Sequence, residues 1–119
     1  MKAIIGVIDF GMGNIQSVIN GFEAIGKKVV KVDSPSSLSK LDGIVLPGVG
    51  AFAQGMKNLK KLGFDDALQE EILIKKKPFL GVCLGLQLLA TSGSEFGEHP
   101  GLDWIKGKVK LMKVDSNNK

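Results

Sequence analysis

One cysteine stands where a nucleophile would be placed. Cys83 is the only cysteine of the chain, and it lies in a Gly-x-Cys-x-Gly pattern between the apolar segment 78–82 and an apolar stretch that follows it. A nucleophile between two glycines at a strand-to-helix corner is the cysteine form of a nucleophile elbow. Such a corner is sharp and strained, so it needs small neighbours that let the backbone approach a substrate. We therefore predict a nucleophilic thiolate, stabilised by the start of the helix; the alternative is a cysteine buried as a small apolar side chain.

A second loop, Pro47-Gly48-Val49-Gly50, ends another apolar segment. Acyl chemistry at a cysteine produces a tetrahedral oxyanion, which needs preorganised hydrogen-bond donors. An elbow supplies one donor from the residue after the nucleophile, the N–H of Leu84, and a neighbouring loop supplies the other. A Gly-Val-Gly turn leaves its N–H groups uncovered and can reorient a peptide at little cost. By itself the motif would be a plain strand-ending turn, but beside the elbow it indicates an oxyanion loop.

A third loop, Gly11-Met12-Gly13-Asn14, follows the first apolar segment. Its Gly-x-Gly is typical of dinucleotide binding, but the third glycine of that motif is missing. A tight turn is the expectation, with Asn14 as a helix cap or a contact to a partner. The only histidine, His99, lies in a Glu-His-Pro-Gly segment, which suits an exposed side chain better than a catalytic base.

The elements that position these loops alternate between strand and helix, which predicts an α/β fold with a largely parallel sheet. We expect strands over 3–9, 28–32, 43–46 and 79–82, and helices over 15–25, 52–62, 64–72 and 84–91. Ligands of parallel sheets bind beyond the carboxyl ends of the strands. The three loops are therefore expected to share one site.

The C-terminal part has a different pattern. Residues 92–101 are predicted to be a loop, 106–114 a strand with one solvent-facing side, and 115–119 a turn or frayed end. Such a strand normally has a partner strand after it, and none follows. We therefore expect a shortened chain whose incomplete sheet exposes apolar surface and an edge strand.

Composition narrows the class of protein. The 119 residues are expected to form a single domain, 1–119, and the net charge of +4 comes without any arginine. Nucleic-acid-binding surfaces usually need arginine or interleaved aromatics, so Lys75-Lys76-Lys77 is interpreted as the last turn of a helix and no nucleic-acid partner is expected. One cysteine and one histidine exclude an internal disulfide and argue against a zinc site. We expect a cytoplasmic protein with no metal, no cofactor and no membrane segment.

With these loops identified, the chain resembles the triad-type glutamine amidotransferases, and among them the glutaminase subunits of imidazole glycerol phosphate synthases. The resemblance rests on three motifs in order and spacing, and it covers the chain without a gap. The matching segments are 8–14, 46–52 and 77–89, and 101–105 also follows the pattern.

The resemblance implies a three-layer, flavodoxin-like α/β fold and the hydrolysis of glutamine to glutamate and ammonia through a thioester on Cys83. It implies an oxyanion hole from the backbone of Val49, Gly50 and Leu84, and substrate contacts from Gly48 and Gln87. Ammonia would pass through a channel to a (β/α)8-barrel synthase subunit of histidine biosynthesis, forming a heterodimer. Gly11, Met12 and Asn14 would lie at that interface.

The sequence departs from the family pattern in one respect. The family completes its triad with a His and a Glu in a His-Pro-Glu segment, whereas His99-Pro100-Gly101 lacks the glutamate and lies in another segment. We therefore expect very low turnover from the 119 residues alone. Three alternatives stay open: the same chemistry feeding amidine formation on a bacterial surface sugar, a non-catalytic partner subunit of a synthase, and a stress-type α/β protein with a reactive elbow cysteine.

Overall fold

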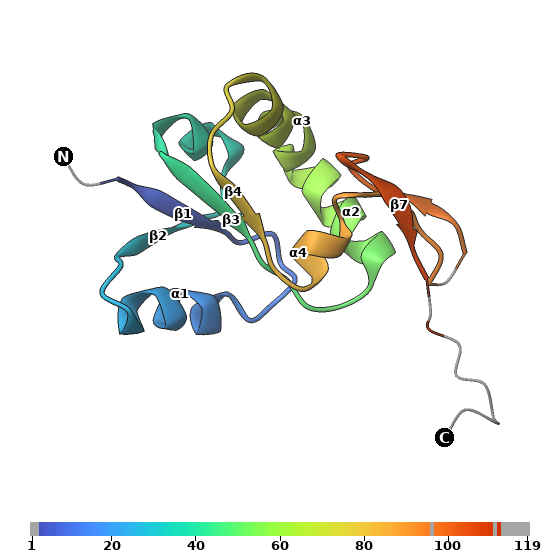
Figure 1. Ribbon diagram of the computed structural model, residues 1–119, viewed down its shortest axis with the longest axis horizontal. Coiled ribbons are helices and arrows are strands. Elements are labelled where there is room, and N and C mark those ends of the chain that lie inside the picture. Colours follow the sequence, from blue (N-terminus) through green and yellow to red (C-terminus); the bar gives the residue numbers. More distant parts are fainter. Residues whose placement is uncertain (1–2, 96, 111, 113–119) are drawn as a thin grey trace.

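The computed structural model describes residues 3–95, 97–110 and 112, and they form two sheets with flanking helices (Figure 1). None of the helices in this described part is both long and apolar enough to cross a membrane. The elements in chain order are β1 (Ile5–Ile8), α1 (Ile15–Ala24), β2 (Val29–Val32), η1 (Pro35–Lys40), β3 (Gly43–Leu46), α2 (Phe52–Leu62), α3 (Phe64–Leu68), η2 (Gln69–Ile74), β4 (Phe79–Gly81), α4 (Leu84–Gln87), β5 (Ala90–Gly93), β6 (His99–Pro100) and β7 (Ile105–Val109).

The main sheet has the order β2-β1-β3-β4, and all of its pairings are parallel. Helix α1 covers one face, while α2 and α3 cover the other (Figure 1). This three-layer arrangement confirms the predicted α/β fold, and each of the four strands lies within a segment expected to be one. The parallel pairing brings the carboxyl ends of β1, β3 and β4 to the same edge, where the three loops begin.

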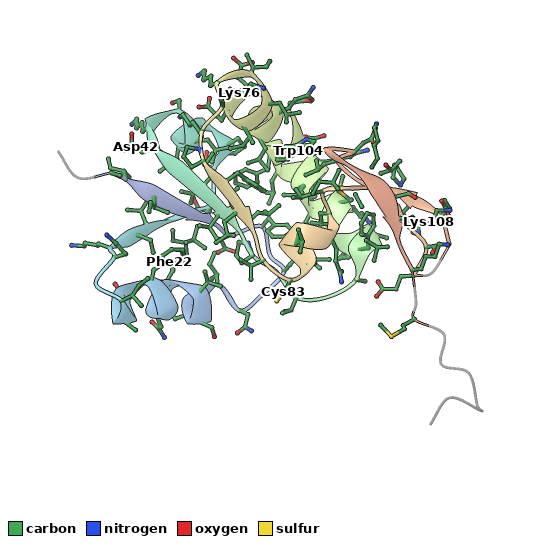
Figure 2. The ribbon with its side chains drawn as sticks, viewed as in Figure 1. Phe22, Asp42, Lys76, Cys83, Trp104 and Lys108 are labelled. Atoms are coloured by element: carbon green, nitrogen blue, oxygen red, sulfur yellow. The ribbon has the colours of Figure 1, made fainter. Side chains whose placement is uncertain are left out.

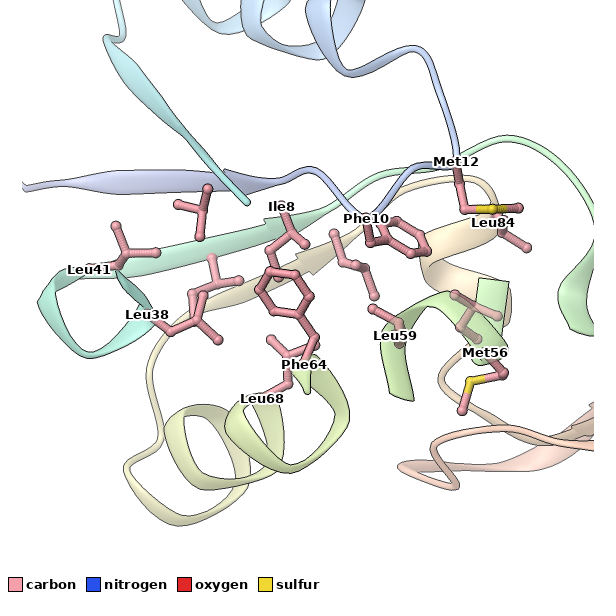
Figure 3. Packing of buried hydrophobic residues seen from close by; sticks show 14 of the residues in the cluster. Ile8, Phe10, Met12, Leu38, Leu41, Met56, Leu59, Phe64, Leu68 and Leu84 are labelled. Carbon is pink, nitrogen blue, oxygen red and sulfur yellow. The ribbon is translucent and has the colours of Figure 1, made fainter. Parts of the chain in front are cut away.

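The central strands are apolar on both sides because both faces of the sheet are covered. On one face, Val7, Val29 and Val45 pack with the partly buried stripe of α1. On the other, the larger cluster includes Ile8 and Phe64, both fully buried (Figure 3). The helix expected over 15–25 is one residue shorter, because α1 ends at Ala24 and Ile25 is 71% exposed.

The segment after the elbow differs from the prediction. The helix expected to reach Thr91 ends at Gln87, and the expected loop 92–101 contains the second half of β5 and all of β6. A second, three-stranded sheet forms with the order β6-β5-β7, in which β7 runs parallel to β5. The strand expected over 106–114 is thus represented by β7, which pairs with β5, a strand earlier in the chain. The expected turn 115–119 lies outside the described residues.

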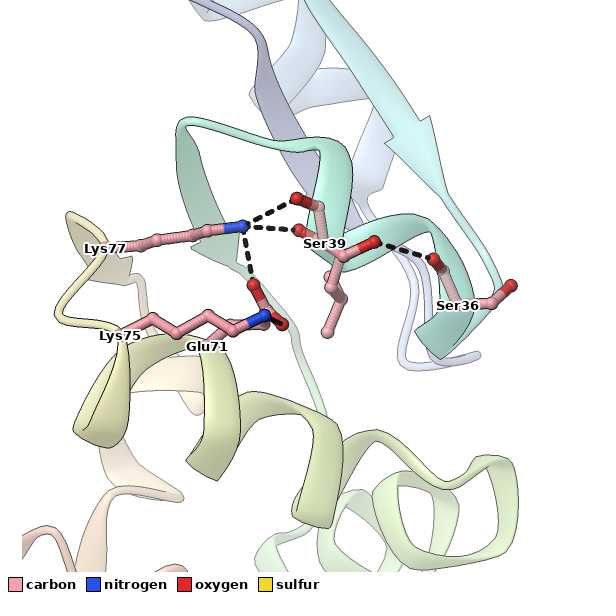
Figure 4. A network of polar contacts seen from close by, with 6 residues as sticks. Ser36, Ser39, Glu71, Lys75 and Lys77 are labelled. Carbon is pink, nitrogen blue, oxygen red and sulfur yellow. Dashed lines mark hydrogen bonds and ion pairs between the residues drawn. The ribbon is translucent and has the colours of Figure 1, made fainter.

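The lysine run lies just after the helix and not in its last turn, because η2 ends at Ile74, Lys75 is its C-cap and Lys76 has φ 62°. The run instead makes polar contacts that connect two elements. Lys77 Nζ lies 2.5 Å from Glu71 Oε1 and also donates to the carbonyls of Leu38 and Ser39, both at 3.0 Å (Figure 4). Lys75 Nζ donates to Glu71 Oε2 at 3.0 Å. The hydrogen bond from Lys77, aided by Lys75, holds the pKa of the buried Glu71 carboxyl below its ordinary value. This network connects η2 to η1 on the side of the sheet that α3 covers.

Candidate functional site

Cys83 occupies the corner between β4 and α4 and is exposed at the carboxyl edge of the sheet (Figure 2). Its backbone has φ 56° and ψ −120°, a conformation that non-glycine residues rarely adopt. Strain of this kind persists only where the surrounding structure enforces it, and it is concentrated at functional sites. The geometry is that of the predicted elbow.

The two glycines of the motif are needed for space. A Cβ at Gly85 would lie 1.7 Å from the carbonyl oxygen of Leu46, and a Cβ at Gly81 would lie 3.0 Å from the Cα of Leu86. The Leu46 carbonyl accepts a hydrogen bond from Val82 N at 3.0 Å, so β3 runs directly against the elbow. The small neighbours therefore let the chain turn sharply beside a strand.

A small pocket of about 150 Å³ opens beside the thiol. All three predicted loops contribute to it: Asn14 from the first, Pro47-Gly48-Val49 from the second, and Cys83 from the elbow. A larger cavity of about 520 Å³ lies at the amino ends of β1 and β2, where Ile4, Lys28 and Val30 line it. Since Cys83 is not among its lining residues, we take the smaller pocket as the candidate site.

Two of the three expected oxyanion donors, Leu84 and Val49, are engaged within the protein. Leu84 N–H donates to the Gly48 carbonyl at 3.1 Å, and Val49 N–H donates to the Met12 carbonyl at 2.9 Å. The Gly48 carbonyl and the Val49 N–H belong to the same peptide unit, so one peptide orientation determines both bonds. Gly48 has φ 154° and Gly50 has φ 123°, which makes both ends of this segment glycine positions.

The Gly11–Asn14 loop contributes backbone more than side chains. Met12 is 9% exposed and packs into the main core, so the interface expected at this residue would involve its backbone. Asn14 occupies the N-cap position of α1 in a left-handed conformation, but its side chain makes no capping bond. Its Oδ1 instead accepts a hydrogen bond from the Ser17 hydroxyl at 2.9 Å, which corrects the interpretation of Asn14 as a cap.

Two other residues considered in the sequence lie away from the pocket. Gln87 is exposed on α4, and its N–H donates to the Cys83 carbonyl at 3.2 Å, yet it is not among the residues lining the pocket. His99 is half-buried on β6, paired with Gly93 in the second sheet, and does not line the pocket either. The structure thus does not bring His99 to the thiol's pocket.

Several contributors could not be found from the sequence. Ser17 and Val18 line the pocket from α1, and Asn58 on α2 holds the first loop through the Phe10 carbonyl. Glu95 accepts a hydrogen bond from Phe52 N at 3.1 Å, at the start of α2 and 43 residues away in the chain. Contacts this distant in sequence leave no local pattern, so only the fold shows them.

With this geometry established, the chain can be compared with known proteins. The family model described as glutamine amidotransferase class-I matches residues 6–118. A solved structure described as a glutamine amidotransferase aligns over 89% of this chain and 55% of that chain, with a TM-score of 0.72 and 20% identity, which supports the fold.

Sequence relatives agree with this match. Imidazole glycerol phosphate synthase subunit HisH 1 of Campylobacter jejuni (strain 81-176) is 47% identical over 116 residues, 98% of this chain and 58% of that protein. Subunit HisH of Sulfurimonas denitrificans is 46% identical over 106 residues, 89% of this chain and 51% of that protein. The chain thus spans somewhat more than half the length of these curated relatives. Because the family model matches nearly the whole length of this chain, the chain belongs to the class-I glutamine amidotransferases.

Proposed function

We propose that this chain carries the nucleophile of a glutaminase subunit of imidazole glycerol phosphate synthase. In this role Cys83 hydrolyses glutamine to glutamate and ammonia, and the ammonia passes through a channel to a (β/α)8-barrel synthase subunit in histidine biosynthesis. The observation that carries the proposal is the strained, exposed Cys83 beside a pocket to which all three loops contribute. The 46–47% sequence identity between this chain and two HisH subunits supports the same assignment.

The chemistry begins with attack by the Cys83 thiolate on the carbon of the glutamine side-chain amide, which forms a C–S bond and an oxyanion. When the oxyanion collapses, the C–N bond breaks, and the nitrogen takes a proton from the general base that had accepted the thiol proton and leaves as ammonia. Water then adds to the glutamyl thioester and gives its proton to a base, and the C–S bond breaks to release glutamate. No His, Asp or Glu is among the described residues that line the pocket, so we propose very low turnover by these 119 residues alone.

The oxyanion hole is proposed to form from the N–H groups of Leu84, Val49 and Gly50. Because Leu84 N–H donates to the Gly48 carbonyl, that carbonyl has to turn away before the donor can reach substrate. Rotation of the Gly48–Val49 peptide achieves this and also releases Val49 N–H from Met12. The glycine at position 48 keeps the cost of such a rotation low.

The remaining roles follow the same scheme. We place Gly48 and Gln87 in contact with substrate, and Gly11, Asn14 and the backbone of Met12 at the interface with the synthase subunit, as a heterodimer. Gly11 and Asn14 are exposed, which suits an interface. A single cysteine suits a reducing compartment, and we place the protein in the cytoplasm.

A chloroketone analogue of glutamine tests the proposal in the complete protein. Displacement of chloride by the Cys83 thiolate gives a thioether of defined mass, and free glutamine is expected to slow the labelling. Asparagine, one methylene shorter, is the matched competitor and should protect far less. If Cys83→Ala left glutamine hydrolysis by the assembled synthase intact, the assignment would be refuted.

Two further measurements separate the alternatives. Deletion of the gene should abolish growth without added histidine, whereas loss of a surface-sugar amidine with normal growth would favour the other pathway. Binding to a synthase subunit without any glutamine hydrolysis would favour the non-catalytic role.

A further inference from the structure

The side chain of Asn58 joins α2 to the Gly11–Asn14 loop at two points. Its Nδ2 donates to the Phe10 carbonyl at 3.0 Å and contacts Met12 Sδ at 3.3 Å. Its Oδ1 accepts a hydrogen bond from Gln54 Nε2 at 2.7 Å, one turn earlier on the same helix. The carboxamide therefore uses both donors of its nitrogen on the loop, while its oxygen is held by the helix.

The loop that Asn58 holds is packed against the proposed oxyanion loop. Met12 accepts the hydrogen bond from Val49 N–H at 2.9 Å, and a Cβ at Gly50 would lie 2.8 Å from Met12 Cε. A Cβ at Gly48 would lie 3.1 Å from Phe10 Cζ. Both residues that Asn58 contacts therefore also touch the proposed oxyanion loop.

Space around the side chain of Asn58 is also restricted. We call the contacts of this side chain with Phe10 and Met12 the clamp. A Cβ at Gly11, which has φ 82°, would lie 3.2 Å from Asn58 Nδ2. The Gly11 N–H donates to Asp9 Oδ1 at 3.2 Å, so the turn is fixed on both sides of the contact with Asn58. A shift of this loop therefore has to break the contacts of Asn58 or move α2.

We propose that Asn58 is a positioning residue of the glutaminase site: oriented by Gln54, it holds Phe10 and Met12 so that the Met12 carbonyl engages the Val49 N–H. The inference rests on the proposed function for the meaning of Val49 as an oxyanion donor. Asn58 thus governs the orientation of the Gly48–Val49 peptide, although it lies on α2 and outside the three loops. Loss of the Asn58 donors is expected to free the Val49 N–H.

Hydrogen exchange at the Val49 amide, measured by NMR on the complete protein, tests this directly. Asn58→Asp keeps the shape but replaces the donating nitrogen with a carboxylate oxygen that faces the Phe10 carbonyl. We expect Val49 exchange to rise about fivefold, the factor that corresponds to loss of roughly one net hydrogen bond. Asn58→Ala, which removes the clamp without adding charge, should give a similar increase.

Asn20→Asp is the matched control. Asn20 Oδ1 accepts a hydrogen bond from Gln16 Nε2 at 2.9 Å on α1, so the same Gln–Asn pair is present on a different helix. The control should leave Val49 exchange unchanged. The amides of Val7 and Val45 in the central strands report on general loosening and should not respond to either Asn58 variant.

The result that overturns the inference is unchanged Val49 exchange in both Asn58 variants, or a rise that Val7 and Val45 share equally. This outcome is distinct from failure of the proposed function, which would appear as Cys83 labelling that glutamine does not slow. Selective release of Val49 alone supports the positioning role, whatever the labelling experiment finds.

Discussion

Substitution of Gly85 by alanine isolates the steric requirement of the elbow. Gly85 is buried, and its backbone is outside the left-handed region that favours glycine, so no conformational penalty accompanies the change. The obstacle is the carbonyl oxygen of Leu46, which would lie 1.7 Å from the new Cβ. This is backbone of a central strand, so no flexible side chain can move aside.

The expected cost follows from that overlap. To reach even a tight contact of 3.0 Å, the two atoms must separate by 3.0 − 1.7 = 1.3 Å. Overpacking of this kind costs roughly 1–3 kcal/mol. The displaced carbonyl also accepts the hydrogen bond from Val82 N, whose weakening adds about 0.5–1.5 kcal/mol. We therefore expect Gly85→Ala to lower the free energy of unfolding by about 2–4 kcal/mol.

Urea unfolding followed by circular dichroism at neutral pH provides the measurement. Gly21→Ala is the control, since nothing lies within 4 Å of a Cβ at this exposed position of α1. Alanine there should raise the free energy of unfolding by about 0.5–1 kcal/mol, because it is the better helix former. A loss at Gly85 smaller than about 0.5 kcal/mol, the usual range for surface changes, would contradict the steric origin of the motif.

Three further predictions concern the framework. Leu59→Ala should lower the free energy of unfolding by about 2–5 kcal/mol because this side chain is fully buried. Leu62→Ala on the same helix, at 42% exposure, should cost far less in the same urea titration; equal losses would place the core elsewhere. Because the pKa of Glu71 is lowered in the folded state, its contribution to stability is present above its ordinary pKa of 4.5 and is lost as the pH falls through the folded value. Urea midpoints measured from neutral to acidic pH should therefore fall less steeply for Glu71→Gln than for the parent chain, and parallel curves would exclude this carboxyl as a source of acid sensitivity.

The sequence predicted the main sheet because its signal is local. β1 and β3 are short apolar runs, and β3 begins at a glycine and is followed by Pro47, which is typical of buried parallel strands. Pro78 marked the beginning of β4, because it cannot lie within a helix. The elbow was equally readable, because its glycines are required by contacts within a few residues of Cys83 and with one neighbouring strand.

The second sheet could not be predicted in the same way. Ala90–Gly93 is polar and small, and its composition is typical of a loop. It forms a strand because tertiary contacts fix it: a Cβ at Gly93 would lie 2.6 Å from the Phe52 ring, and β7 pairs along its edge. The spacing of apolar residues up to Leu89 favours a helix, and nothing in that pattern shows where the helix ends.

The orientation of the loop 47–50, the proposed oxyanion loop, is a further property that residue types do not encode. Gly48 and Gly50 indicate that the loop can reorient, but the bonds from Leu84 to Gly48 and from Val49 to Met12 determine which way its peptide points. Both bonds join segments more than 30 residues apart in the chain. The sequence therefore predicted the parts of the site, whereas their closed arrangement depends on how the loops pack.

The strain at Cys83 and the packing of the core depend on each other. A non-glycine residue at φ 56° costs about 1–3 kcal/mol, so the surrounding structure has to hold it in place. Leu84 and Leu88, which follow Cys83 on α4 and its C-cap, are buried against the main core and anchor the chain beyond the corner. On the N-terminal side of Cys83, Val82 N–H donates a hydrogen bond to the Leu46 carbonyl, which fixes the chain just before the corner. With both flanks anchored, the turn has to be completed at Cys83 itself, and this is why the thiol is presented at the sheet edge while Leu84, the next residue, is buried.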